Sequence, residues 1–128
     1  MPEDLSANLS MPLLMPSQAQ KHVTHNEALL VLDALVQLTV VDRDLAVPPS
    51  SPVNGDRHIV APAAAGLWGA PAHSIAVFVN NTWVFYEPRP GWQAYVLSEN
   101  RNVVWQDGAW QGSLSSLEAL GMLIVTEN

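Results

Sequence analysis

The stretch "QAQKHVTHNEALLVLDALVQ", residues 18–37, concentrates side chains that could do chemistry. His22 and His25 stand three residues apart, Glu27 follows two residues later, and Lys21 comes just before them. Imidazoles and carboxylates are ligands for zinc, and the same groups transfer protons in general acid–base catalysis. The stretch therefore raises two hypotheses, a metal site and a proton-transfer pair.

The same residues also have the pattern of a helix start. Thr24 followed three residues later by Glu27 is a capping box, so we expect Thr24 to be the N-cap. His22 then precedes the helix and His25 lies in its first turn, so the two imidazoles do not share a helical face as a zinc pair would. No further His or Cys stands at a spacing that completes a site. We therefore predict no metal, no cofactor and no catalytic residue here.

A second candidate is "GDRHIV", which places Asp56, Arg57 and His58 after a turn. An Asp–His pair suggests a catalytic triad, but no glycine-flanked serine accompanies it. A structural ion pair or a turn contact is the commoner role of such residues. We predict that the protein is not an enzyme.

The elements that position these residues follow from proline placement and hydrophobic spacing. Pro2, Pro12 and Pro16 predict an extended N-terminal arm over residues 1–20, which carries several apolar side chains. "THNEALLVLDALVQL" follows with apolar residues at helical spacing and predicts one helix. "AAAGLWGAPAHS" reads as a small-residue linker.

The second half of the chain has the patterns of β structure. "IAVFVNNTWVFYEP" and "NVVWQDGAWQG" are each two alternating runs joined at Asn80-Asn81 and Asp107-Gly108, which suit tight hairpins. We predict an α+β fold in which the arm and one helix pack on an antiparallel β-meander of short hairpins. Residues 21–112 would form this single domain, and residues 113–128 a C-terminal segment.

Composition excludes several classes of protein. The net charge is −7, and five Lys and Arg cannot form the positive surface that nucleic acids need. The absence of cysteine excludes disulfides and thiolate chemistry. The acidic N-terminus does not resemble a signal peptide, and no apolar run is long enough for membrane insertion.

Five tryptophans are many for so short a chain. Most aromatic side chains in a small β domain belong to its core. Aromatic faces beside amides also suit sugar rings, and Trp92, Trp105 and Tyr95 are the candidates for binding a glycan.

"PSQAQKHVTHNEAL", "LDALVQL" and "DRDL", followed by "GDR.IV" and a "GW.AYV..E" stretch, resemble the DUF2793 family from about Leu13 to Trp110. The resemblance implies a component of phages, prophages or gene transfer agents, such as a head spike or tail fibre. It implies a particle assembled in the bacterial cytoplasm and released by lysis, with other capsid, spike or tail proteins as partners. No catalytic residue is carried over from the family.

Two functions are therefore expected. The first is a non-enzymatic virion or gene-transfer-agent appendage protein that acts in assembly and host-surface attachment. It would be a homo-oligomer, with a trimer favoured, and its assembly contacts would come from Gln18, Gln20, Lys21, His22 and His25. The alternative is a carbohydrate-binding module for a host capsule or envelope polysaccharide.

Overall fold

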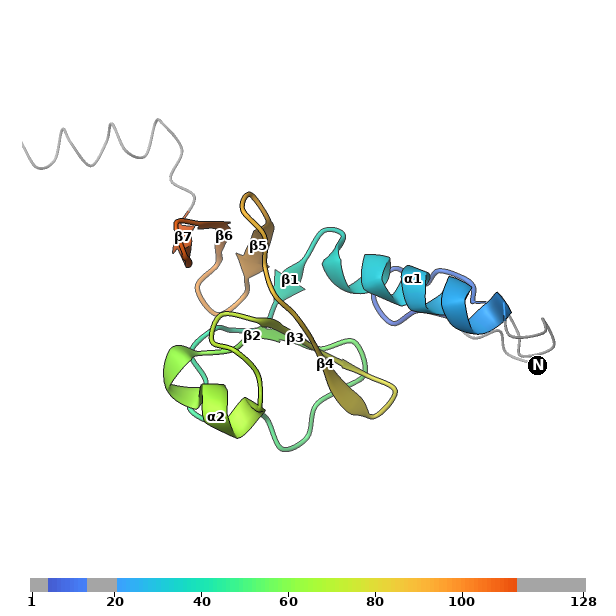
Figure 1. The fold of residues 1–128 in the computed structure, drawn as a ribbon, viewed down its shortest axis with the longest axis horizontal. Helices are drawn as coiled ribbons and strands as arrows, with labels where there is room; N and C mark the ends of the chain where they lie inside the picture. The colour runs from blue at the N-terminus through green and yellow to red at the C-terminus, as the bar shows by residue number, and fades with distance from the viewer. Residues whose placement is uncertain (1–4, 14–20, 113–128) are drawn as a thin grey trace, which may run out of the picture.

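The computed structural model describes residues 5–13 and 21–112, and shows a β-rich body from which one long helix projects (Figure 1). The elements are α1 (Lys21–Leu35), β1 (Thr39–Val40), β2 (Arg57–Ile59), the 3₁₀ helix η1 (Pro62–Ala64), α2 (Ala65–Trp68), β3 (Ile75–Val79), β4 (Thr82–Tyr86), β5 (Gln93–Val96), β6 (Arg101–Gln106) and β7 (Ala109–Gly112). The α+β class predicted from the sequence is confirmed.

The strands form two sheets. One sheet has three strands in the order β2-β3-β4, and the other has four in the order β1-β5-β6-β7. All neighbouring strands are antiparallel except β1 and β5, which pair in parallel with Thr39 opposite Tyr95. The predicted meander is divided between the two sheets, with β3 and β4 in one and β5, β6 and β7 in the other. The edge of β5 pairs with β1, which comes from the start of the domain.

Strand β3 is buried on both of its faces. Ile75 and Val77 point toward the four-stranded sheet, and Ala76 between them points toward α2. Successive side chains of a strand point to opposite faces, so a run that is apolar throughout requires cover on both sides. The body consequently has three layers, with the three-stranded sheet between α2 and the four-stranded sheet.

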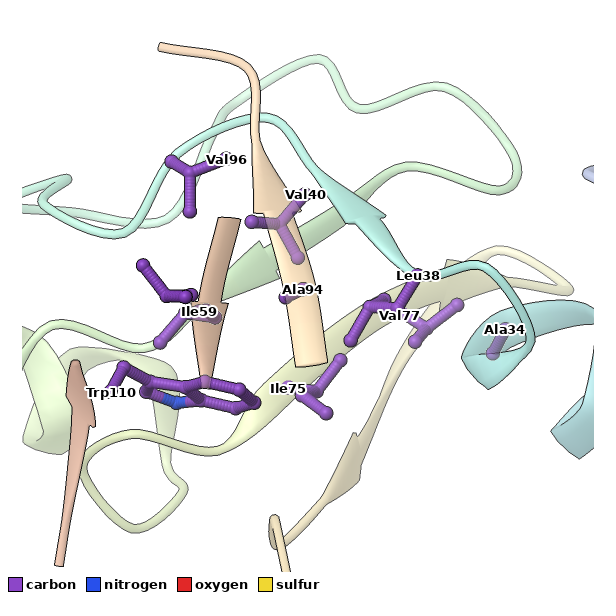
Figure 2. Packing of buried hydrophobic residues seen from close by; sticks show 10 residues of the cluster. Ala34, Leu38, Val40, Ile59, Ile75, Val77, Ala94, Val96 and Trp110 are labelled. Carbon is purple, nitrogen blue, oxygen red and sulfur yellow. The ribbon is translucent and has the colours of Figure 1, made fainter. Parts of the chain in front are cut away.

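The main core lies between the two sheets. Figure 2 shows side chains from both sheets and from the end of α1 converging on one space. This core consists of Ala34, Leu38, Val40, Ile59, Ile75, Val77, Ala94, Val96, Val103 and Trp110. A smaller cluster on the other face of β3 contains Val60, Ala64, Trp68 and Ala76.

Both predicted hairpin turns are confirmed. Asn80 and Asn81 join β3 to β4 with φ angles of 53° and 63°, and Asp107 and Gly108 join β6 to β7 with 54° and 73°. Two positive φ angles in succession match the right-handed twist of the flanking strands, and Asn, Asp and Gly adopt them at low cost.

Two local predictions are wrong. The helix begins at Lys21, so Thr24 lies inside it and is not the N-cap; no residue between the two positions breaks a helix. "AAAGLWGAPAHS" is not a linker, because it forms η1 and α2 and buries Trp68. Proline at the start, alanines within and Gly69 in the left-handed conformation at the end are the signals of a short helical segment.

The described part of the arm, residues 5–13, is a closed turn. Leu5 pairs with Pro12 as an isolated bridge, and the Ser6 amide donates to the Met11 carbonyl over 3.0 Å. The turn lies against α1 and also approaches Gly55, where an added Cβ would lie 2.7 Å from the Ala7 Cβ. The chain therefore needs glycine at this contact. The C-terminal segment predicted over residues 113–128 lies outside the described residues.

The intersheet core predicts a contrast between two identical substitutions. Val96→Ala removes two methyl groups from a fully buried site and should lower the free energy of unfolding by about 2 kcal/mol. Val53→Ala, at a side chain that is 67% exposed, is the matched control and should change it by less than about 0.5 kcal/mol. Urea denaturation followed by tryptophan fluorescence measures both, and equal losses would contradict this assignment of the core.

Candidate functional site

The candidate catalytic residues of the sequence do not converge. His25 and Glu27 are exposed on α1, and of Lys21 and His22 the structure describes only the main chain. Within residues 5–13 and 21–112, no group of three His, Asp or Glu side chains could hold a metal ion. No helix in the same ranges is long and apolar enough to cross a membrane.

The "GDRHIV" residues have three separate roles. The Asp56 carboxylate accepts a hydrogen bond from the Val53 amide in the preceding turn (2.8 Å). Arg57 and His58 are neighbours on β2 and point to opposite faces of the sheet, as strand geometry requires. Arg57 reaches α1, where its Nη1 donates to the Ala34 carbonyl (3.0 Å). No triad results from this arrangement.

His58 is a buried structural residue. Its Nδ1 lies 2.9 Å from the Asp42 carboxylate, which the sequence pattern did not identify as the partner. The rings of Trp68 and Trp83 enclose the imidazole at centroid distances of 6.0 and 5.7 Å and lie 4.9 Å from each other. Aromatic cover of this kind leaves no approach for a substrate, so the pair anchors the loop after β1 to the body.

Asp33 is the buried acid that binds the N-terminal turn to α1. Its carboxylate accepts hydrogen bonds from the Leu9 amide (2.5 Å), the Asn8 amide (2.9 Å) and the Asn8 side chain (3.1 Å). Burial by itself raises the pKa of Asp33, but these bonds and one from the Ser6 side chain outweigh it and hold the pKa below its ordinary value. An acid inside the apolar run "LLVLDALV" was the available sequence signal for this role.

Arg57 lies close enough to this junction for its charge to interact with Asp33. Burial lowers the pKa of its guanidinium, and the negative charge of Asp33 opposes that change. The Arg57 guanidinium thus binds the carbonyl end of α1 and also interacts with the charge of Asp33, which holds the turn. The junction is polar and occupied, so it is a structural device and offers no open site.

The ion pair of Arg43 and Glu99 links the loop after β1 to the four-stranded sheet. Arg43 donates to both carboxylate oxygens of Glu99, over 2.6 and 2.8 Å, and to the Trp110 carbonyl over 3.0 Å. The hydrogen bond and charge of Arg43 lower the pKa of Glu99. A cleft of about 240 Å³ lies beside this pair, but the pairing leaves little of the Arg43 charge for a ligand.

The candidate glycan residues separate into two groups. Trp92 and Trp105 are half-buried and pack against the main core. The Trp105 ring also contacts Trp110 and His73, with centroid distances of 5.5 and 5.4 Å. Tyr95 instead lines an open groove of about 540 Å³ on the other face of the same sheet.

This groove is lined by neutral residues. They are Leu35, Gln37, Leu38, Thr39, Gly91, Gln93, Ala94, Tyr95 and Asn102. They come from the end of α1, from β1, β5 and β6, and from the turn before β5. Sequence reasoning identified only Tyr95 among them, because the parallel pairing of β1 with β5 is what brings the two halves of the chain together.

Helix α1 presents an apolar surface with no cover from the described residues. Its Asp33 side carries the N-terminal turn, and the opposite side contains Ala28, Val31, Leu32 and Leu35. Val31 is 38% exposed and Leu32 is 49% exposed. Apart from its last turn, where Ala34 joins the core and Leu35 packs against it, α1 runs clear of both sheets (Figure 1). Exposed apolar surface of this kind marks an interaction site more often than a free surface.

The family model described as "Protein of unknown function (DUF2793)" matches residues 25–111 of the chain. No curated protein matches it.

Replacing the buried acid should release the N-terminal turn. In Asp33→Asn the amide cannot accept all the bonds that the carboxylate accepts, so the protection of the Asn8 and Leu9 amides against hydrogen exchange should fall. The free energy of unfolding should drop by about 2 kcal/mol. Asp44→Asn, at an exposed acid, is the control and should leave both quantities unchanged. Undiminished protection in Asp33→Asn would show that the turn is held by something else.

The same junction predicts a dependence on pH. The folded-state pKa of Asp33 is depressed, so its stabilisation is complete at neutral pH. It should be lost as the pH falls below about 4, the unfolded value, and on through the folded one. Protection factors of the Leu9 amide, corrected for the intrinsic exchange rate and measured by NMR along an acid titration, should decline in that direction. Protection that increases toward acid would contradict the assignment.

Proposed function

The chain belongs to the DUF2793 family, and from the geometry of α1 we propose that it is a non-enzymatic structural subunit that associates with copies of itself. The observation that carries the proposal is the exposed apolar face of α1, defined by Ala28, Val31 and Leu32, with the half-buried Leu35 at its end. The resemblance of its N-terminal motif to proteins of phages and gene transfer agents gives the setting that we propose, a virion appendage acting in assembly and host attachment.

The spacing of this face supports pairing between helices. The four residues stand at positions i, i+3, i+4 and i+7, which is the spacing of a helix–helix seam. A second copy presents the same side chains at the same spacing, so a symmetric contact brings apolar groups against apolar groups along the whole seam.

The net charge of the chain also favours a second copy as the partner of this face. Each copy has a net charge of −7, so copies repel one another in general, and only an uncharged surface can bring them together at low cost. The four residues of the face carry no charge. An acidic or basic partner would find no complementary group among them.

The N-terminal turn lies on the Asp33 side of α1, opposite this face, and so stays outside the contact. Leu5 and Leu9 are 51% and 41% exposed on the turn that Asp33 holds against α1. His25, one of the predicted assembly residues, is exposed on the side of α1 that carries Leu32, seven residues later. We place His25 at the margin of the contact. Gln18 and Gln20 lie outside the described residues.

A charge placed in the face should prevent association. The wild-type chain should be a closed oligomer, with a trimer as the expected form, in light scattering at neutral pH. Leu32→Glu would bury a carboxylate in every copy of the contact and should give a monomer. Leu67→Glu, on α2 and 64% exposed, is the matched control and should leave the oligomer intact.

The outcomes separate clearly. A wild-type monomer, or an oligomer that survives Leu32→Glu, would overturn the proposal that α1 mediates assembly. Circular dichroism of both variants should match the wild type, since each change is at a side chain that is exposed in the single chain.

A further inference from the structure

We infer that the groove lined by Gln37, Gln93, Tyr95 and Asn102 binds a neutral sugar residue of a polysaccharide. The inference does not depend on the proposed self-association, because its polar residues lie outside the apolar face of α1 and only Leu35 belongs to both. Its place also differs from that of the two tryptophans that the sequence suggested, Trp92 and Trp105, which both pack against the core.

The register of the strands builds the polar surface. Thr39, Tyr95 and Asn102 are opposite one another on β1, β5 and β6, and so form one row across the sheet. Gln93, Val104 and Gln111 form the next row across β5, β6 and β7. Their strand neighbours Val40, Ala94, Val96 and Val103 are buried in the core on the opposite face. Alternation therefore directs hydroxyl and amide groups outward.

These groups have the chemistry that sugars require. A side-chain amide offers a donor and an acceptor at one end of a flat group, which matches a pair of neighbouring sugar hydroxyls. An aromatic ring provides an apolar face for the C–H side of a pyranose. Gln37, Gln93 and Asn102 supply three amides to the groove that Tyr95 also lines. The Tyr95 hydroxyl donates to the Asn100 side chain and is thereby oriented. Leu38 and Ala94, which belong to the main core, also line the groove.

Gln37 is unusual for its position. It follows the last residues of α1 with a φ of +50°, where glycine is the common residue because it has no Cβ. A residue with a side chain is strained in this left-handed conformation. The side-chain amide of Gln37 lines the groove.

The lining also selects the charge of the ligand. Among the described residues, no acidic or basic side chain lines the groove, so a carboxylate or phosphate group would lose water without gaining an ion pair there. With a volume of about 540 Å³ and an open side, the groove suits one or two sugar rings of a longer chain.

Saturation-transfer difference NMR on the full chain tests the inference. The probes are D-glucose, D-galactose, L-rhamnose and N-acetyl-D-glucosamine as neutral sugars, and D-glucuronate as the charged one. At least one neutral sugar should receive saturation and give a titratable dissociation constant, with glucuronate weaker. Gln93→Ala combined with Asn102→Ala should weaken that binding at least tenfold. Both side chains are exposed, so the variant should fold.

Gln106→Ala is the matched control, because Gln106 is exposed on the same strand as Asn102 but does not line the groove. It should bind as the wild type does. Absence of transfer to every neutral sugar, equal binding by the double variant, or tighter binding of glucuronate would each overturn the inference. The readout is independent of oligomeric state, so this result and the light-scattering result can fail separately.

Discussion

The structure depends on the burial of strand β3 on both faces. Ile75 and Val77 require one apolar layer and Ala76 requires another, so a single sheet with one solvated side cannot satisfy this strand. The four-stranded sheet covers one face, and η1 and α2 cover the other, where the small Ala76 leaves space for the Trp68 ring. The four-stranded sheet and the η1–α2 segment both pack against β3. Neither of them covers the length of α1 (Figure 1).

The projecting helix explains the position of the buried polar groups. A helix joined to the body only by its last turn needs other ties, and Asp33 and Arg57 provide them at that end. Asp33 holds the N-terminal turn, while Arg57 holds the carbonyl end of α1 to β2. These bonds cover one side of α1 and fix its direction, and they leave the apolar side of Leu32 outward. The proposed assembly face is thus a consequence of how the helix is attached.

The two faces of the four-stranded sheet differ in polarity. The inner face is apolar and supplies half of the main core, including Val96 and Val103. The outer face carries amides and hydroxyls and is joined at its edge by the end of α1. In a sheet that is solvated on one side, apolar inward residues commonly alternate with polar outward ones. This pattern alone would predict charged outward residues as readily as amides. The described residues that line the groove are all uncharged, and this is what makes it a candidate site.

Local patterns in the chain were sufficient for the elements whose causes are local. The turns at Asn80-Asn81 and Asp107-Gly108 depend on residues that tolerate positive φ, and the α+β class depends on hydrophobic periods, so both were predictable. The start of α1 was misplaced because a capping box at Thr24 does not prevent a helix from beginning a turn earlier. Distant pairings were not predictable: Asp42 with His58, Asp33 with Leu9, and Thr39 beside Tyr95 each join segments whose meeting depends on how the layers pack. The amino-acid pattern thus specified the strands, the turns and the apolar helix. Long-range packing determined which distant residues come together on one face. The reason is that the hydrophobic effect is non-directional: it favours the burial of apolar area and the filling of volume, but it does not by itself specify which residues pair.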